Sequence, residues 1–396
     1  MKKIQKPVRS RLFFVGMMYF FIQGIPSYNR VISAKHARDY SSFYYAQKVA
    51  VEGKSPYHTP YLTQKAKEEK TRRRVHPFFY PPPAILIFLW NYPLSLYSSY
   101  IIFFVINHIL VVWIYVLLKK WLEISWLRLG LLFVVCTPIA DSIMMGQVNW
   151  IVLLLLLLSF QKKRGAILSA AAMIKMSPAI LLLPQIIWKK WTFVGWCICF
   201  AIIFSIISLP ILSFEIQKSF YFDVLPQFSS GKYSGLNVPF HLKSNHSLPE
   251  LCAQFFPAAE GEIISSTAKN VAMLINMSGV LGLSALAWKK GEDLCILGAF
   301  VVLMVLFPMY TYEHHLIFLL FPAAVLLRNW NEQDRWFRIL SMVTIFFLFW
   351  PLSWWKEMQR VLPSMRWWFQ ESKCMSALLL MGLLCYSSLY SKDKAR

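Results

Sequence analysis

The chain has 396 residues, of which 57% are hydrophobic and 15% charged, whereas a soluble domain carries about a quarter charged residues. Long apolar runs recur along the whole sequence, and a membrane helix needs roughly 20 apolar residues. These features exclude a soluble protein with one buried core and predict an all-α polytopic membrane protein. The net charge of +22 would suggest nucleic-acid binding in a soluble protein. Here the basic residues stand in short tracts between apolar runs, without a nucleic-acid-binding motif, so they indicate orientation in the membrane.

The first apolar segment, residues 12–25, follows a basic start and is typical of a signal peptide. No small-x-small cleavage site precedes the next polar stretch, so we predict a retained anchor in a helix at 11–28. Further membrane helices are expected at 97–118, 127–143, 147–160, 192–212, 270–288, 293–309, 316–328, 337–353 and 374–390. A short apolar element at 84–96 is broken by Asn91 and Pro93.

The segment 165–187 is apolar but interrupted by Lys175 and Pro178. Basic tracts favour the cytoplasmic side of a membrane. They can all lie on that side if 165–187 enters the membrane and returns as two short helices that break near Lys175–Pro178. A single helix is the alternative. A break of this kind is tolerated only where it is buried in protein or lines a wet cavity.

The opposite side then receives the polar segments 29–83, 141–147, 213–269 and 354–373. We expect a single integral membrane domain, 1–396, in which 29–83 and 213–269 are two larger non-cytoplasmic loops. The first of these loops is itself basic, against the simple orientation rule. Binding of an anionic substrate is one reason to keep cations there.

The seven cysteines form no CxxC pair or Cys/His cluster with zinc spacing. No carboxylate cluster or DxD pair is evident either, so we predict no cofactor and a metal-independent protein. A disulfide between Cys252 and Cys374 is conceivable if both lie on the outer side.

Asp39 stands at the start of a plausible helix that follows the first apolar run, with Phe43, Ala46 and Ala50 on one face. Its carboxylate either interacts with the helix dipole or acts as a general base at the membrane surface. Lys175 lies about ten residues from either polar flank, and a charge inside the membrane is a functional-site hypothesis by default. A phosphate would satisfy it, and so would a carboxylate or carbonyl of the protein.

Other polar residues stand where apolar segments begin or end. Each residue has two possible interpretations. One is structural, as a helix cap, a membrane-entry turn or a chance glycosylation sequon, and the other is a role in binding sugar or phosphate. They are Tyr80 before three prolines, Gln147 and Asn149 after Gly146, Asn245 and Ser247 around His246, and the pair His314 and His315.

Taken together, these segments resemble glycosyltransferase family 87, a family of C-type integral membrane enzymes. The resemblance covers about 36 to 325 and rests on six motifs in order. They are D-x-x-x-F-Y-x-A at 39–46, followed by Gly53, Pro56 and Tyr57; Phe79-Tyr80-Pro81-Pro82; Gly146-Gln147-x-Asn149; Lys175-x-x-Pro178; Asn245-x-Ser247; and His314-His315. The chain departs from the pattern at His246, where glutamine is common, and in a strongly basic stretch at 65–74.

The resemblance implies a C-type glycosyltransferase fold with about 10 to 12 membrane helices, some short or broken. It implies a polyprenyl-phosphate sugar donor, with mannose the best-known sugar, and a glycan or glycolipid acceptor. It also implies an inverting reaction on the non-cytoplasmic face of a plasma membrane, as expected in a bacterium. Asp39 is then the catalytic base. The donor phosphate is assigned to Lys175, Arg38, His314 and His315, and the sugar or acceptor to Tyr44, Tyr80, Gln147, Asn149, Asn245 and Ser247.

Two other functional classes remain open from the sequence. A transporter or flippase for lipid-linked sugars would also have broken helices and a membrane lysine, but we find no inverted repeat. A non-catalytic subunit of envelope assembly would not need the retained polar set.

Overall fold

The computed structural model describes residues 37–229, 240–241, 244–260, 262–328, 330 and 333–391. Within these residues every regular element is a helix. The predicted helical membrane fold is confirmed, because four helices are long and apolar enough to cross a membrane. They are α5 (Leu96–Leu122), α11 (Trp191–Ser208), α15 (Ser266–Lys290) and the segment Pro363–Tyr390, which contains most of α20 (Arg366–Ser391). The predicted anchor helix at 11–28 lies outside the described residues.

Shorter apolar helices pack between these spans, as expected for a bundle with short or broken members. They are η2 (Pro82–Asn91), α8 (Asn149–Lys162), α9 (Gly165–Ile174), η3 (Ser177–Leu181) with α10 (Leu182–Ile187), and α16 (Leu294–Leu306). Helix α16 has 13 residues and is buried along almost its whole length. It is surrounded by protein, so it does not have to match the thickness of the lipid core.

One predicted straight helix, 127–143, is bent. The chain forms α6 (Trp126–Val135) and α7 (Pro138–Met145), which meet at 62°. Pro138 has no backbone N–H to continue the helical ladder, and the hydroxyl of Thr137 donates to the carbonyl of Phe349 at 2.8 Å. The prediction of one helix was wrong here, because hydropathy does not register this change of direction.

The break in the segment 165–187 is confirmed. Helix α9 ends at Ile174, and Lys175 has extended backbone angles (φ −146°, ψ 124°) before η3 begins at Ser177. Pro178 at the start of η3 suits this geometry, because its fixed φ is tolerated in a first helical turn. The ammonium side chain of Lys175 therefore leaves the chain from a non-helical link between two short helices.

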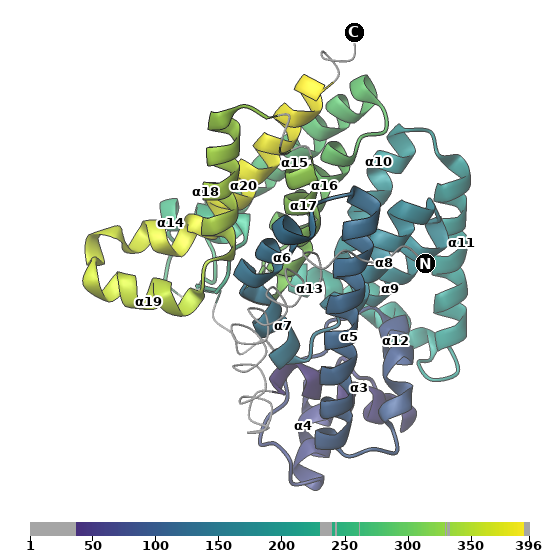
Figure 1. Cartoon of the computed structure of the whole chain (residues 1–396). Helices are drawn as coiled ribbons and strands as arrows, with labels where there is room; N and C mark the ends of the chain where they lie inside the picture. Colours follow the sequence, from purple (N-terminus) through teal and green to yellow (C-terminus); the bar gives the residue numbers. More distant parts are fainter. Residues whose placement is uncertain are drawn as a thin grey trace, which may run out of the picture.

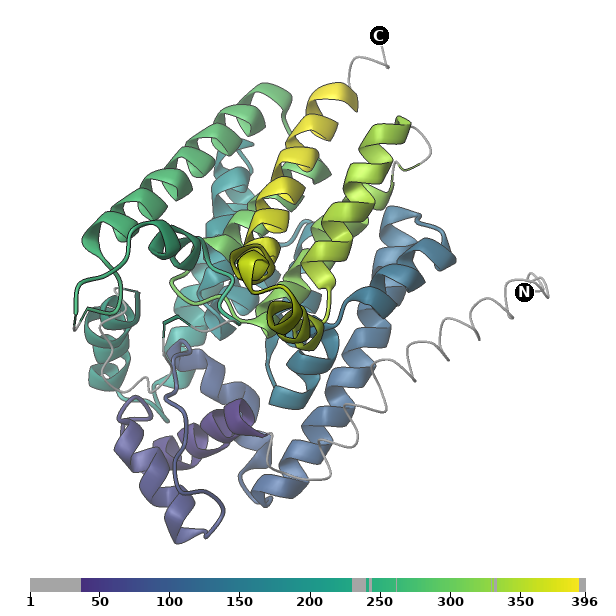
Figure 2. The same cartoon turned by 90° about the vertical axis from the view of Figure 1, so that its left-hand side faces the viewer.

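The polar segments predicted as outer loops are mostly helical. Residues 38–68 form α3 (Arg38–Val51) and α4 (Thr59–Glu68), which lie together at one end of the bundle (Figures 1 and 2). The second segment contains α12 (Phe214–Ser219), the π-helix η4 (Phe220–Val224), α13 (Leu225–Ser229) and α14 (Leu248–Phe255). Their buried residues show that both segments pack against the bundle.

The C-terminal part of the chain departs from prediction in one place. The predicted 316–328 helix is η5 (Glu313–Leu319) followed by α17 (Leu320–Arg328), and the 337–353 helix is α18 (Arg335–Phe349). The segment 354–373 is not a polar loop. It forms α19 (Leu352–Val361), the short η7 (Pro363–Met365) and the first part of α20, which begins well before residue 374. The charged residues Glu371 and Lys373 suggested a loop, but both are buried against protein.

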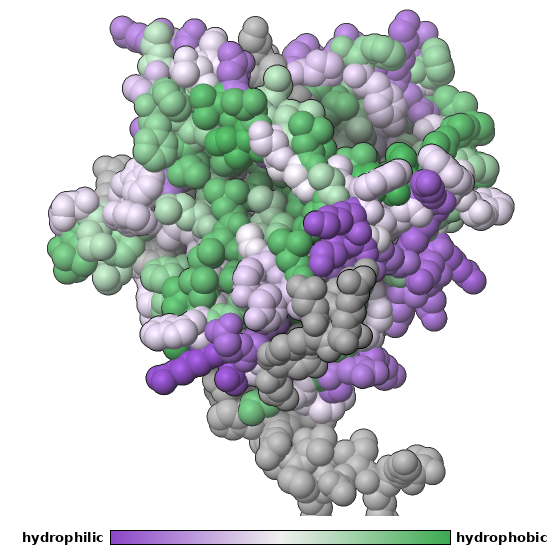
Figure 3. All heavy atoms as spheres, turned by 90° about the horizontal axis from the view of Figure 1, so that it is seen from above, coloured by the Kyte–Doolittle hydropathy of each residue, from purple (hydrophilic) through white to green (hydrophobic). Residues whose placement is uncertain are grey.

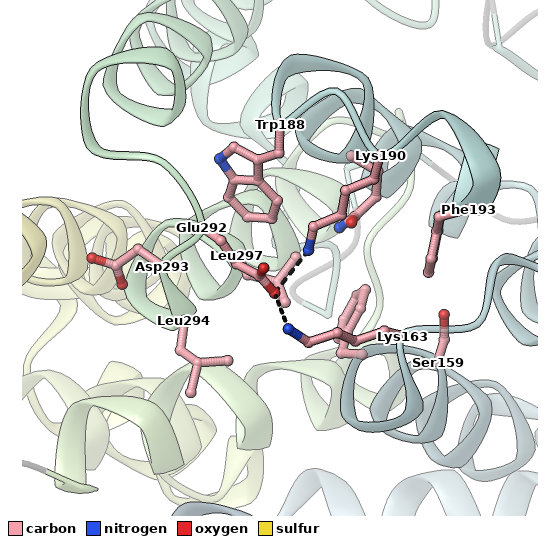
Figure 4. A pocket seen from close by; sticks show the side chains of 11 residues that line it. Ser159, Lys163, Trp188, Lys190, Phe193, Glu292, Asp293, Leu294 and Leu297 are labelled. Atoms are coloured by element: carbon pink, nitrogen blue, oxygen red, sulfur yellow. Dashed lines mark ion pairs between the residues drawn. The ribbon is translucent and has the colours of Figure 1, made fainter.

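Basic turns gather at the end of the bundle opposite α3 and α4. Glu292 binds Lys190 at 2.7 Å and Lys163 at 3.5 Å, which joins three turns around a pocket that Trp188 and Phe193 also line (Figure 4). Lys290 donates to the carbonyl of Leu389 near the C-terminal end of α20. Figure 3 views the molecule from this end and shows hydrophilic side chains distributed among apolar ones. The basic turns at Lys163, Lys190 and Lys290 thus share one end, as the orientation rule expects of basic tracts.

All seven cysteines are free thiols, including Cys252 and Cys374, so the conceivable disulfide is not present.

Gly146 closes α7 with φ +66°, and a Cβ built there would lie 2.7 Å from the Cβ of Tyr40 in α3. We predict that Gly146→Ala destabilises the protein by more than the ~1–2 kcal/mol of a left-handed alanine, because Tyr40 must also move. Thermal unfolding in detergent measures this change. Gly282→Ala in α15, where a Cβ meets nothing within 4 Å, is the matched control and should be neutral or slightly stabilising, because alanine favours a helix interior over glycine. Equal unfolding temperatures for the two variants would show that the α3–α7 contact is not tight.

Candidate functional site

Helix α3 brings Asp39 to the bundle. Asp39 lies in the first turn of α3 and is partly exposed, whereas Tyr40 and the rest of the first two turns are buried. The ring of Phe43 packs 4.5 Å from that of Tyr80 and 4.6 Å from that of Phe88 in η2. This aromatic packing fixes the helix, so the carboxylate of Asp39 is presented from a rigid element.

Gln147 holds the Asp39 carboxylate. The left-handed turn at Gly146 directs Gln147 towards α3, where its Nε2 donates to Asp39 Oδ2 at 2.5 Å. The Oε1 of the same amide accepts the hydroxyl of Tyr80 at 3.0 Å. Burial, with the nearby Asp39 carboxylate, raises the pKa of Tyr80, so its hydroxyl stays protonated and donates. An ionised carboxylate only accepts, which leaves this amide one orientation.

Asn149, two residues after Gln147, binds the ammonium group of Lys175. Its Oδ1 accepts from the Nζ of Lys175 at 2.8 Å, and its Nδ2 donates to the carbonyl of His314 at 2.9 Å. Lys175 also lies over the ring of Phe318, 5.7 Å from its centroid. Among the described residues no carboxylate lies within ion-pair distance of Lys175. The amide oxygen occupies one of the three ammonium donors.

The two adjacent histidines meet the same site. The Nδ1 of His314 lies 3.6 Å from the Oδ2 of Asp141 in α7, and the two histidine rings are 4.4 Å apart. The Nδ1 of His315 accepts from the backbone N–H of Tyr312. Asp39 and His315 each lie close enough to Lys175 to act on it electrostatically. The carboxylate, the ammonium group and the imidazoles therefore form one electrostatically connected site.

Four other predicted residues are not joined to this group by a contact. Arg38 is exposed beside Asp39. Tyr44 is buried, and its hydroxyl donates to the carbonyl of Leu94 at 2.8 Å. Asn245 and Ser247 are also fully buried and bind backbone groups of 309–311. Their hydrogen bonds attach the second outer segment to the start of η5.

Sequence reasoning missed a buried charged group beneath the histidines. Glu313 accepts a hydrogen bond from the ammonium group of Lys373 in α20, and its Oε2 lies 3.0 Å from the Nε2 of His246. All three side chains are at least nine-tenths buried. A charge in the middle of an apolar helix is a sequence signal for function. Lys373 stands at the polar start of the apolar run 374–390, so it does not carry this signal in the sequence and fell within the predicted outer segment 354–373.

The model of glycosyltransferase family 87 matches residues 78–311, more than half of the chain. The chain belongs to glycosyltransferase family 87. No curated protein matches it. The family match contains Tyr80, Gln147, Asn149 and Lys175 and begins after α3.

Membership makes this protein a membrane glycosyltransferase with a sugar donor and an acceptor. The polar group described above offers such an enzyme a fixed carboxylate that can accept a proton and a fixed cation that can bind an anion. In the described residues, no three His, Cys, Asp or Glu side chains are grouped as ligands of a metal ion.

We predict that Gln147→Leu lowers kcat/KM for sugar transfer by about 10- to 100-fold, because a hydrogen bond to a charged group contributes about 1.5–3 kcal/mol. Initial rates of transfer in membranes with matched protein levels measure the effect. Gln185→Leu is the matched control: Gln185 is equally buried but lines the pocket at the opposite end. A Gln147→Leu enzyme as active as this control would show that the amide does not position Asp39.

Proposed function

We propose that this protein transfers a sugar from a polyprenyl-phosphate carrier to a glycan or glycolipid acceptor, with mannose as the first sugar to test. The observation that carries the proposal is the pairing of Asp39 with Gln147 and of Lys175 with Asn149, from the two ends of a Gln-x-Asn stretch. One group can take a proton from an attacking hydroxyl, and the other can receive an anionic leaving group.

The proposed reaction is a single inverting displacement. The carboxylate of Asp39 accepts the proton of an acceptor hydroxyl while that oxygen bonds to the anomeric carbon. The bond between this carbon and the phosphate oxygen breaks, with an oxocarbenium-like transition state as expected in glycosidic chemistry. The lipid phosphate leaves with its bonding electrons, and the ammonium group of Lys175 stabilises the negative charge.

The surrounding residues receive supporting roles in this proposal. His315, which lies within electrostatic range of Lys175, and the adjacent His314 would complete the phosphate site, whereas Gln147, Asn149 and Tyr80 would orient the charged groups. The phosphate-binding role of Arg38 and the sugar- or acceptor-binding roles remain predictions, the latter for Tyr44, Tyr80, Gln147, Asn149, Asn245 and Ser247. The hydrogen bonds of Tyr44, Asn245 and Ser247 favour structural roles.

We further propose that the site faces away from the cytoplasm of a bacterial plasma membrane and works without a metal ion. Basic turns at the opposite end of the bundle support this orientation, because such turns favour the cytoplasmic side. A nucleotide sugar is cytoplasmic, so a site on the outer face calls for a donor carried by a lipid. A lipid monophosphate lacks the diphosphate that commonly recruits a divalent cation.

We expect Asp39→Asn to lower kcat by about 10²- to 10⁴-fold, the usual contribution of a general base, with normal expression. The test compares envelope glycans and lipid-linked sugars by mass spectrometry in a deletion strain complemented with wild type or variant. Asp223→Asn, at an exposed position, is the matched control. A glycan one sugar short, with accumulated lipid-linked donor, identifies the sugar. Wild-type glycans in the Asp39→Asn strain would refute the assignment of Asp39.

We expect Lys175→Met to reduce kcat/KM about 10- to 100-fold, mostly through weaker donor binding, because a charge-assisted bond to phosphate is lost. Titration of the purified protein with the lipid-phosphate donor measures the affinity. Lys218→Met, which removes an exposed lysine in α12, should leave it unchanged. Equal donor affinity in both variants would argue against a phosphate at Lys175.

A further inference from the structure

Lys373 is an ionisable residue inside a helix long enough to span the membrane, with none of its surface exposed. Its ammonium group donates to Glu313 Oε1, and Glu313 Oε2 faces the Nε2 of His246 at 3.0 Å. The three residues come from α20, from η5 and from the segment that precedes α14. A buried pair of this kind is weak evidence for stability, since apolar residues often serve as well.

The pair fixes the start of η5. Glu313 follows a short stretch that is held from the other side, where Thr311 N–H donates to Asn245 Oδ1 at 2.9 Å. The carbonyl of Thr311 accepts from the N–H of His246 at 2.7 Å. Residues 311–313 are therefore held by the hydrogen bonds of Thr311 to Asn245 and His246 on one side, and by the ion pair of Glu313 with Lys373 on the other.

From this point two hydrogen bonds lead to the cation of the proposed active site. His314 directly follows Glu313, and its carbonyl accepts from Asn149 Nδ2 at 2.9 Å. The Oδ1 of the same amide accepts from Lys175 Nζ at 2.8 Å. An amide group is planar, so the position of the His314 carbonyl decides where the oxygen that holds Lys175 points.

We propose that Lys373 is a positioning residue for the donor-phosphate site, acting through Glu313, the His314 carbonyl and Asn149 on the ammonium group of Lys175. This proposal rests on the proposed function, because it takes the lipid phosphate to be the ligand of Lys175. Without the ion pair, the start of η5 shifts, the amide of Asn149 turns, and Lys175 loses the acceptor that aims it.

The experiment measures donor and acceptor KM separately for Lys373→Met, Lys373→Arg and Lys190→Met. Lys373→Met is expected to raise the donor KM at least ten-fold and to leave the acceptor KM within two-fold. Lys373→Arg should recover most of the loss, because its guanidinium also binds a carboxylate. Lys190→Met is the matched control, since it removes a lysine paired with Glu292 at the opposite end of the bundle. It should leave both KM values unchanged.

A double-variant comparison separates positioning from general destabilisation. Once Lys175 is replaced by Met, the further change Lys373→Met should alter donor binding less than two-fold, because the group that it positions is gone. Effects that multiply in full would overturn the proposal. So would a Lys373→Met protein with a lower unfolding temperature but an unchanged donor KM. If Lys373→Met does not fold, Glu313→Gln removes the charge with little change of shape and carries the same test.

A readout without substrate distinguishes this proposal from the proposed function. The rate at which an amine reagent labels Lys175, followed by mass spectrometry, reports its surroundings directly. We expect this rate to change in Lys373→Met and to stay constant in Lys190→Met. A changed rate in Lys373→Met, with donor affinity unaffected by Lys175→Met, would reject the phosphate assignment and retain the link. An unchanged rate would reject the link itself.

Discussion

The side-chain amides of Gln147 and Asn149 hold the charged groups of the site from one short junction between α7 and α8. Gln147 binds the Asp39 carboxylate from α3, and Asn149 binds the Lys175 ammonium group from the break after α9. The left-handed Gly146 makes this possible, because it ends α7 and lets α3 approach closely. Both amides use their other end on the protein, at the Tyr80 hydroxyl and the His314 carbonyl. The carboxylate and the cation are therefore positioned by groups that have no freedom to turn.

Broken helices are the structural consequence of placing such a site in an apolar bundle. The bend between α6 and α7, the extended link at Lys175 and the 3₁₀ turn of η5 all leave regular helix geometry close to the polar group. Irregular backbone is tolerated at membrane depth only where protein or a wet cavity surrounds it. Here the backbone and side chains of neighbouring elements supply that surrounding, as the Asn149 bond to His314 and the Thr137 bond to Phe349 illustrate.

Neutral and charged partners are distributed unevenly around the site. Lys175 is held by an amide oxygen, whereas Lys373 in α20 is paired with Glu313. A lysine paired with a carboxylate has little remaining attraction for an anion, whereas one held by a neutral amide has no opposite charge paired with it. This difference is why we assign an anionic ligand to Lys175 and a positioning role to Lys373. In the sequence, Lys175 interrupts an apolar segment and Lys373 stands beside Glu371 at the polar start of one, so the partner of neither can be read from the sequence.

The sequence by itself determined the class of the protein and most of its helices, because long apolar runs have few other stable arrangements in a cell. It also indicated a break near Lys175, since a charge and a proline interrupt an otherwise apolar segment, but a single helix remained the alternative until the structure showed the break. Only the tertiary structure decided the bend at Pro138, the early start of α20 and the partners of each polar residue. Hydropathy predicts Glu371 and Lys373 to be loop residues, whereas the structure buries both. From the sequence, Asn245 and Gln147 are equally plausible sugar ligands. In the structure, Asn245 binds the backbone just before η5, whereas Gln147 binds the carboxylate of Asp39. Hydrogen-bond partners distant in the chain depend on packing, and local pattern does not encode them.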